Sequence, residues 1–112
     1  MIVQEILPLK QLPIALTQEV LVEFCQRWKV QELYLFGSVL REDFRPDSDV
    51  DLMVLFKPEA RWGFEFVRMK DELEELLQRD VDLLTKESIE KSHNWIRQEE
   101  ILSTSRLIYV AR

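Results

Sequence analysis

Residues 35–56 read LFGSVLREDFRPDSDVDLMVLF, and they join a Gly-Ser pair to an Asp-x-Asp pair through ten residues. Gly37 and Ser38 end one apolar run, and Asp49 and Asp51 open the next. Side chains two residues apart in a strand point to the same face, about 7 Å apart along the backbone, so the two carboxylates can address one place. Carboxylates arranged in this way bind hard divalent cations.

The Gly-Ser pair suits the anionic end of a metal-bound nucleoside triphosphate. A glycine lets the backbone approach a bulky anion, and a helix that follows it would direct free N–H groups at phosphate. Ser38 adds a hydroxyl donor. The chain has only two glycines among its 112 residues, about 2% where ~7% is usual. Gly37 is therefore not a residue that this sequence uses in ordinary turns.

The segment resembles the signature of the DNA polymerase beta superfamily of nucleotidyltransferases, in which Gly-Ser, ten residues and Asp-x-Asp follow one another. Within it, the chain resembles the minimal nucleotidyltransferases, whose typical core reads close to LFGSRARGDxRPDSDIDLLV. Glu42 stands where glycine is commoner in that core. The family has a third carboxylate on a later strand, and Asp82 in the run VDLLT matches it. The resemblance covers about residues 17–85, and its matching positions in the core are Arg41, Asp43, Arg45, Pro46, Asp47, Ser48, Asp49, Asp51 and Leu52.

The resemblance implies an α/β (α+β) nucleotidyltransferase fold, a small mixed β-sheet flanked by helices, and transfer of AMP from ATP to a hydroxyl group. Asp49 and Asp51 would bridge two Mg²⁺ ions, for which Mn²⁺ can substitute, and Asp82 would complete the ion on the acceptor side. Gly37 and Ser38 would hold the β and γ phosphates. Without metal the three carboxylates repel one another, so one pKa should rise.

The acceptor is expected to be another protein, because a chain this short has no room for a separate acceptor domain. Many minimal nucleotidyltransferases resemble antitoxins that neutralise a HEPN-domain RNase toxin by transferring AMP to a tyrosine of that toxin. We therefore expect a cognate HEPN toxin as partner. Two alternatives remain: an aminoglycoside-like enzyme that modifies small molecules in a homodimeric cleft, and a non-catalytic module that blocks a toxin by contact alone. The three intact carboxylates argue against the second.

A calcium-binding loop is the main rival interpretation of the acidic run, because Asp47, Asp49 and Asp51 imitate the start of an EF-hand. Such a loop needs glycine at its sixth position and a bidentate glutamate at its twelfth. Leu52 and Pro58 occupy those positions here. Asp51 also sits inside a run that is typical of a buried strand, where carboxylates are rarely without a partner. The run is therefore interpreted as part of a nucleotide site.

Composition indicates one domain over residues 1–112, since 46% hydrophobic content provides a modest single core. No apolar run approaches the ~18 residues that span a bilayer, so we expect a cytoplasmic protein without membrane contact. The net charge of -6 argues against strong nucleic-acid binding. Arg41 and Arg45 are few enough to serve one triphosphate, although surface arginines are usually just solvated. Cys25 is the single cysteine and is expected in the core.

The hydrophobic pattern predicts alternating helices and strands. The long helix over 63–78 should direct Phe66, Met69, Leu73 and Leu76 to the core. Trp62 and Phe64 flank its first residue, and they either stack on the nucleotide base or close the core. The predicted helices are 17–29, 38–43, 63–78, 86–91 and 95–104, and the predicted strands are 32–36, 49–56, 81–84 and 106–110.

Overall fold

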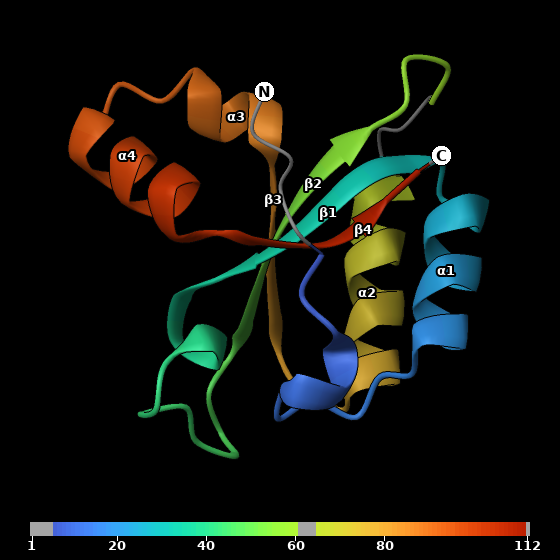
Figure 1. The fold of residues 1–112 in the computed structure, drawn as a ribbon. Helices are drawn as coiled ribbons and strands as arrows, with labels where there is room; N and C mark the ends of the chain where they lie inside the picture. Colours follow the sequence, from blue (N-terminus) through green and yellow to red (C-terminus); the bar gives the residue numbers. More distant parts are fainter. Residues whose placement is uncertain (1–5, 61–64, 112) are drawn as a thin grey trace.

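The computed structural model describes residues 6–60 and 65–111, and it places a four-stranded sheet of order β3-β2-β1-β4 between helices (Figure 1). The predicted α/β class, with a small mixed sheet flanked by helices, is confirmed. The helices are α1 (Gln18–Arg27), α2 (Glu65–Leu77), α3 (Lys86–Glu90) and α4 (Trp95–Thr104), with 3₁₀ turns η1 (Leu9–Gln11) and η2 (Gly37–Leu40). The strands are β1 (Val30–Phe36), β2 (Val50–Phe56), β3 (Val81–Thr85) and β4 (Arg106–Val110).

The sheet is mixed, because β1 runs antiparallel to both β2 and β4 whereas β2 and β3 are parallel. Parallel neighbours require a crossover, which α2 provides. In this register Asp51 pairs with Phe36 on one side and with Asp82 on the other. The end of β1 and the starts of β2 and β3 therefore meet at one edge of the sheet.

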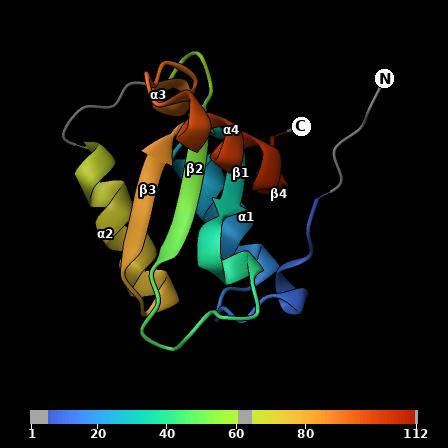
Figure 2. The ribbon, with the colours of Figure 1, turned by 90° about the vertical axis from the view of Figure 1, so that its left-hand side faces the viewer.

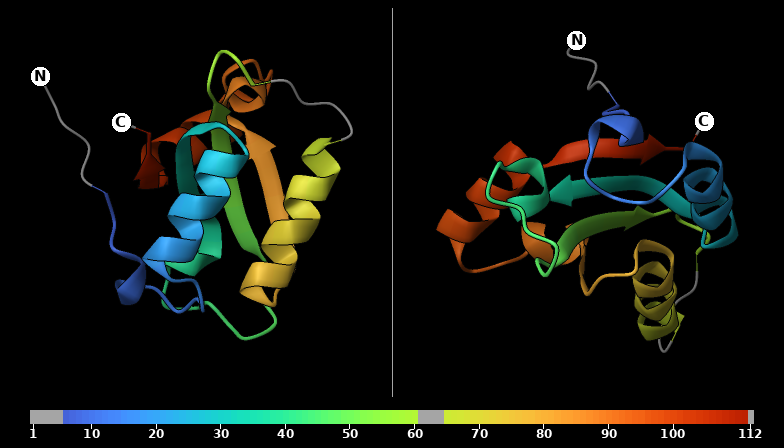
Figure 3. Two further views of the ribbon diagram at one scale, coloured as in Figure 1. Left: turned by 90° about the vertical axis from the view of Figure 1, so that its right-hand side faces the viewer. Right: turned by 90° about the horizontal axis from the view of Figure 1, so that it is seen from below.

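Helices cover both faces of the sheet. Helices α1 and α2 lie on one face, and α3 and α4 lie on the other (Figures 2 and 3). The core under α1 and α2 includes the fully buried Phe24, Leu33 and Met69. The smaller core under α3 and α4 includes Tyr34 and Met53. Because Asp51 and Met53 are two residues apart in β2, Asp51 belongs to the second face.

Helix α1 forms where the sequence predicts it, although it ends at Arg27 and not at residue 29. Thr17 caps it, its side chain accepting from the Val20 N–H at 3.3 Å. Cys25 is fully buried in the core, and burial raises the pKa of its thiol well above the usual range, so the expected core thiol is confirmed. The side chain of Arg27 links α1 to α2, with Nη1 donating to Glu72 Oε1 at 2.8 Å.

Several ends of helices and strands, and the set of buried residues on α2, differ from the predictions. Strand β1 begins two residues earlier, at Val30, because Lys29 has a positive φ of 57° that ends the preceding turn. The predicted helix 38–43 is only the 3₁₀ turn η2. On α2 the buried residues repeat every four positions as Met69, Leu73 and Leu77, so Phe66 and Leu76 are only partly buried.

Trp62 and Phe64 lie outside the described residues, so their expected contact with a base or with the core stays a prediction. Within residues 6–60 and 65–111, the structure has no helix of the length and apolar character needed to cross a membrane.

Candidate active site

Three carboxylates gather at the edge of the sheet where β2 and β3 begin. Asp51 is the second residue of β2 and is half-buried, and its register partner on β3 is Asp82, which is exposed. Asp49 precedes β2 by one residue and is also exposed, so it belongs to the loop and not, as predicted, to the strand. The structure thus brings together the three acids that the sequence singled out, one from a loop and two from adjacent strands.

Asp51 is close enough to Asp82 and Asp49 for their negative charges to act on its carboxyl group. Burial, together with the negative charges of Asp82 and Asp49, raises the pKa of the Asp51 carboxyl to about 6. Arg41 and Arg97 oppose the rise. In the conformation shown, no three His, Cys, Asp or Glu side chains of the described residues converge tightly enough to hold a metal ion. The donor chemistry nevertheless suits Mg²⁺, which prefers carboxylate oxygens and retains several of its waters.

Gly37 packs directly against the Asp51 carboxylate. Its φ is +78°, a conformation that side chains other than glycine rarely adopt. A Cβ atom added at Gly37 would lie 2.1 Å from Asp51 Oδ2, far inside van der Waals contact. Two features therefore require glycine at this position: the positive φ, and the lack of space for a Cβ atom beside the Asp51 carboxylate. Because η2 has only four residues, phosphate binding here would depend on individual N–H and hydroxyl groups and not on a helix dipole.

Gly37→Ala is expected to destabilise the protein by about 1–3 kcal/mol, since the left-handed backbone costs about 1–2 kcal/mol and the clash adds to it. The free energy of unfolding in urea measures the loss. Ser38→Ala, which removes a hydroxyl without straining the backbone, serves as the control. A Gly37→Ala variant as stable as Ser38→Ala would contradict the described packing.

A pocket of about 680 Å³ opens beside Asp51, between η2 and α4. This volume lies within the range of ligand sites. Its first wall includes Gly37, Ser38 and Arg41, and its second wall comes from the C-terminal part of the chain. The residues of that second wall include Arg97, Glu100, Ile101, Thr104 and Arg106.

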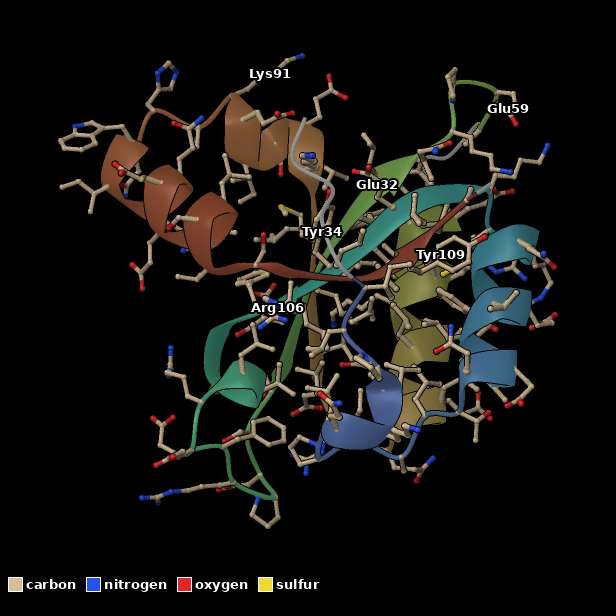
Figure 4. The ribbon with its side chains drawn as sticks, in the orientation of Figure 1. Glu32, Tyr34, Glu59, Lys91, Arg106 and Tyr109 are labelled. Atoms are coloured by element: carbon tan, nitrogen blue, oxygen red, sulfur yellow. The ribbon has the colours of Figure 1, made fainter. Side chains whose placement is uncertain are left out.

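Arg97 and Arg106 were not singled out from the sequence, yet both line the pocket. Figure 4 shows Arg106 where β4 begins, at a position paired with Leu35 of β1. Among the described residues neither guanidinium forms an ion pair with a carboxylate. Two unpaired guanidinium groups facing a pocket that contains Asp51 suit a polyanionic ligand such as a triphosphate. Nothing local in the sequence signals this, because Arg97 reaches the pocket through the packing of α4 and Arg106 through the pairing of β4 with β1.

The two arginines that the sequence did single out have different positions. Arg41 lines the pocket and also pairs through Nε with Asp43 Oδ1 at 3.2 Å. Arg45 does not line the pocket. Its backbone N–H donates to Ser48 Oγ at 3.0 Å, which shapes the loop before Asp49.

The chain resembles known proteins in both sequence and fold. The nucleotidyltransferase domain family matches residues 18–108. A protein adenylyltransferase called MntA, from Thermococcus cleftensis, is 39% identical over 67 residues, which are 60% of this chain and 67% of the relative.

Two solved structures have the same fold. The matched chain of a toxin-antitoxin complex with AMP-PNP superposes with a TM-score of 0.62 at 19% identity, covering 82% of this chain and 72% of its own. The second is a complex of a tri-AMPylated HEPN toxin with an MNT antitoxin from Shewanella oneidensis. Its matched chain gives a TM-score of 0.57 at 19% identity, with 83% of this chain and 69% of that chain covered.

Proposed function

This chain belongs to the nucleotidyltransferase domain family, and from that premise we propose that it transfers AMP from ATP to a hydroxyl group of a cognate HEPN-domain toxin, which it neutralises as an antitoxin. The observation that carries the proposal is the meeting of Asp49, Asp51 and Asp82 beside a pocket that begins at Gly37 and Ser38. The adenylyltransferase relative and the structural neighbour that contains an AMPylated HEPN toxin support the choice of AMP and of the partner.

In the proposed reaction the acceptor oxygen attacks the α-phosphorus of ATP. A new P–O bond forms, the bond to the β-phosphate oxygen breaks, and pyrophosphate leaves with the electron pair while the hydroxyl proton passes to a base. Gly37 and Ser38 would bind the β and γ phosphates through N–H and hydroxyl donors. Arg41, Arg97 and Arg106 would neutralise the charge of the triphosphate from both walls of the pocket.

Asp49, Asp51 and Asp82 would hold Mg²⁺, which supplies charge stabilisation for the attacking and leaving oxygens. The half-buried Asp51 is the register partner of Asp82 and is influenced by the charges of both other acids, so it is the natural shared ligand. Asp82 is exposed on β3, so it would serve the side that the acceptor approaches. A tyrosine hydroxyl is the acceptor that we propose, because it can extend from a partner surface into such a site.

A contact-only inhibitor is the second candidate, and the raised pKa of Asp51 is the observation that weighs against it. Keeping a half-buried carboxylate beside two others costs folding free energy. Binding by contact alone does not require these carboxylates to be close together. A metal site does require it, because the bound cation offsets their repulsion. The small-molecule alternative is distinguished by its acceptor, since it would not require a protein partner.

Binding of Mg²⁺ with ATP is expected to stabilise the protein by about 2.7 kcal/mol when the ligand is at a hundredfold its dissociation constant. Thermal unfolding with Mg²⁺ alone, with ATP in EDTA and with both together measures the effect. The combination should exceed either component, because the carboxylates and the arginines then all find partners. If no nucleoside triphosphate shifts unfolding with Mg²⁺ or Mn²⁺ present, the proposed site is wrong.

A further inference from the structure

Arg79 contacts the loop that carries Asp49. It lies between α2 and β3, and its Nη1 atom is within 2.8 Å of the carbonyl oxygen of Arg45. The same nitrogen is 3.2 Å from the carbonyl oxygens of Pro46 and of Ser48. One guanidinium nitrogen thus donates hydrogen bonds to three backbone carbonyl oxygens within the four residues that precede Asp49.

The same guanidinium also stacks on an aromatic ring. Its central carbon is 4.3 Å from the centroid of the Phe44 ring. A planar guanidinium can donate in its plane and stack through its face at once, which a lysine ammonium cannot do. No described carboxylate forms an ion pair with Arg79, so its polar contacts are with the loop backbone.

The segment that contains Arg79 fixes the other side of Asp49 as well. The Val50 N–H donates to the carbonyl oxygen of Asp80 at 3.0 Å. The Ser48 carbonyl and the Val50 N–H, which flank Asp49, are therefore both held by consecutive residues of one short segment. That segment continues into β3 and leads directly to Asp82.

We propose that Arg79 is a positioning residue that holds the Asp49 loop in register with Asp82 and so prepares the carboxylates for divalent metal. The inference rests on the proposed function, because it assigns Asp49 and Asp82 to one metal site. A loop that is already ordered loses less conformational entropy when an ion binds. Arg79 itself does not line the pocket beside Asp51, so we do not expect it to contact a nucleotide bound there.

The test separates metal affinity from nucleotide affinity. Binding to the whole chain is measured by isothermal titration calorimetry, first with Mn²⁺ at saturating ATP and then with ATP at saturating Mn²⁺. Arg79→Met should raise the half-saturating Mn²⁺ concentration about 10–100-fold, as loss of an outer partner of a metal ligand commonly does. The half-saturating ATP concentration at saturating Mn²⁺ should stay close to the parent's.

Two matched variants accompany it. Arg68→Met removes an exposed arginine of α2 that lies away from this loop, and it should leave both titrations unchanged. Arg79→Lys keeps the charge without the stacking and should fall between the parent and Arg79→Met. If Arg79→Met does not fold, the same titrations are made with Phe44→Leu and Arg79→Lys. Both substitutions should weaken Mn²⁺ binding.

Parent-like Mn²⁺ binding in the Arg79 variants would overturn the inference. Equal losses in the Mn²⁺ and ATP titrations would also overturn it, because Arg79 would then act on the fold or the pocket in general. A parent protein that binds no Mn²⁺ with ATP is a different result, since it contradicts the proposed function itself.

Discussion

Asp51→Asn is expected to abolish nucleotidyl transfer while leaving the metal-free protein as stable as the parent or more stable. The substitution removes the central carboxylate, so activity should fall by more than the ~10–100-fold that loss of an outer partner of a metal ligand costs. In the metal-free fold the ionised Asp51 is unfavourable, because it is half-buried beside Asp82 and Asp49. After allowance for solvent screening, its removal should stabilise the fold by about 1–2 kcal/mol.

Transfer of labelled AMP and urea unfolding in EDTA measure the two effects. Asp71→Asn is the matched control, because Asp71 is an exposed carboxylate of α2 away from the site. The control should keep its activity and unfold like the parent. An Asp51→Asn protein that unfolds more readily than the parent would mark Asp51 as a structural residue held by favourable interactions.

The difference in unfolding free energy between Asp51→Asn and the parent, both without metal, is expected to depend on pH. The pKa of Asp51 is about 6 in the folded protein, above the ordinary value of 3.8 that applies to the unfolded chain. Between these values the folded state keeps a proton that the unfolded state has lost, so the free energy of unfolding falls as pH rises. The advantage of Asp51→Asn over the parent should therefore grow from about pH 4 to pH 6 and then level off.

The first wall of the site could be predicted from sequence, because its residues are close together in the chain. Gly37, Ser38 and Asp51 belong to one motif whose strand-turn-strand pattern is local. The pairing of Asp51 with Asp82 depends on strand register. The resemblance pointed to Asp82, but hydrophobic periodicity alone does not fix which residues of β2 and β3 stand opposite each other.

The second wall of the pocket could not be predicted, because it depends on tertiary packing. The pattern of 95–104 correctly predicted a helix but not the face of the sheet on which it packs. Arg97 on this helix and Arg106 at the start of β4 therefore gave no local signal that they share a pocket with Asp51. Arg79 was missed for a similar reason, since a charged residue next to a helix end normally indicates a solvated turn. Its contacts become visible only when the loop before Asp49 folds back against it.

Catalytic neutralisation of the partner is the second large expected effect. With ATP and Mg²⁺ present, a small fraction of a molar equivalent of this chain should inactivate the RNase activity of the proposed HEPN-domain partner, because in the proposed reaction each molecule modifies many acceptors. Asp49→Asn should lose this activity, since it removes a carboxylate of the proposed metal site. The control is the same mixture without ATP, in which inhibition should require about equal molar amounts or be absent.

The intact mass of the proposed HEPN-domain partner, measured after incubation with a small fraction of an equivalent of this chain, ATP and Mg²⁺, tests the central claim most directly. We expect the mass of the whole partner population to rise by one or more AMP units, at a tyrosine, with release of pyrophosphate. The Asp49→Asn chain should leave the mass unchanged. Inhibition that is strictly stoichiometric, leaves the partner unmodified and is equally strong with Asp49→Asn would contradict the account and identify the chain as a contact inhibitor.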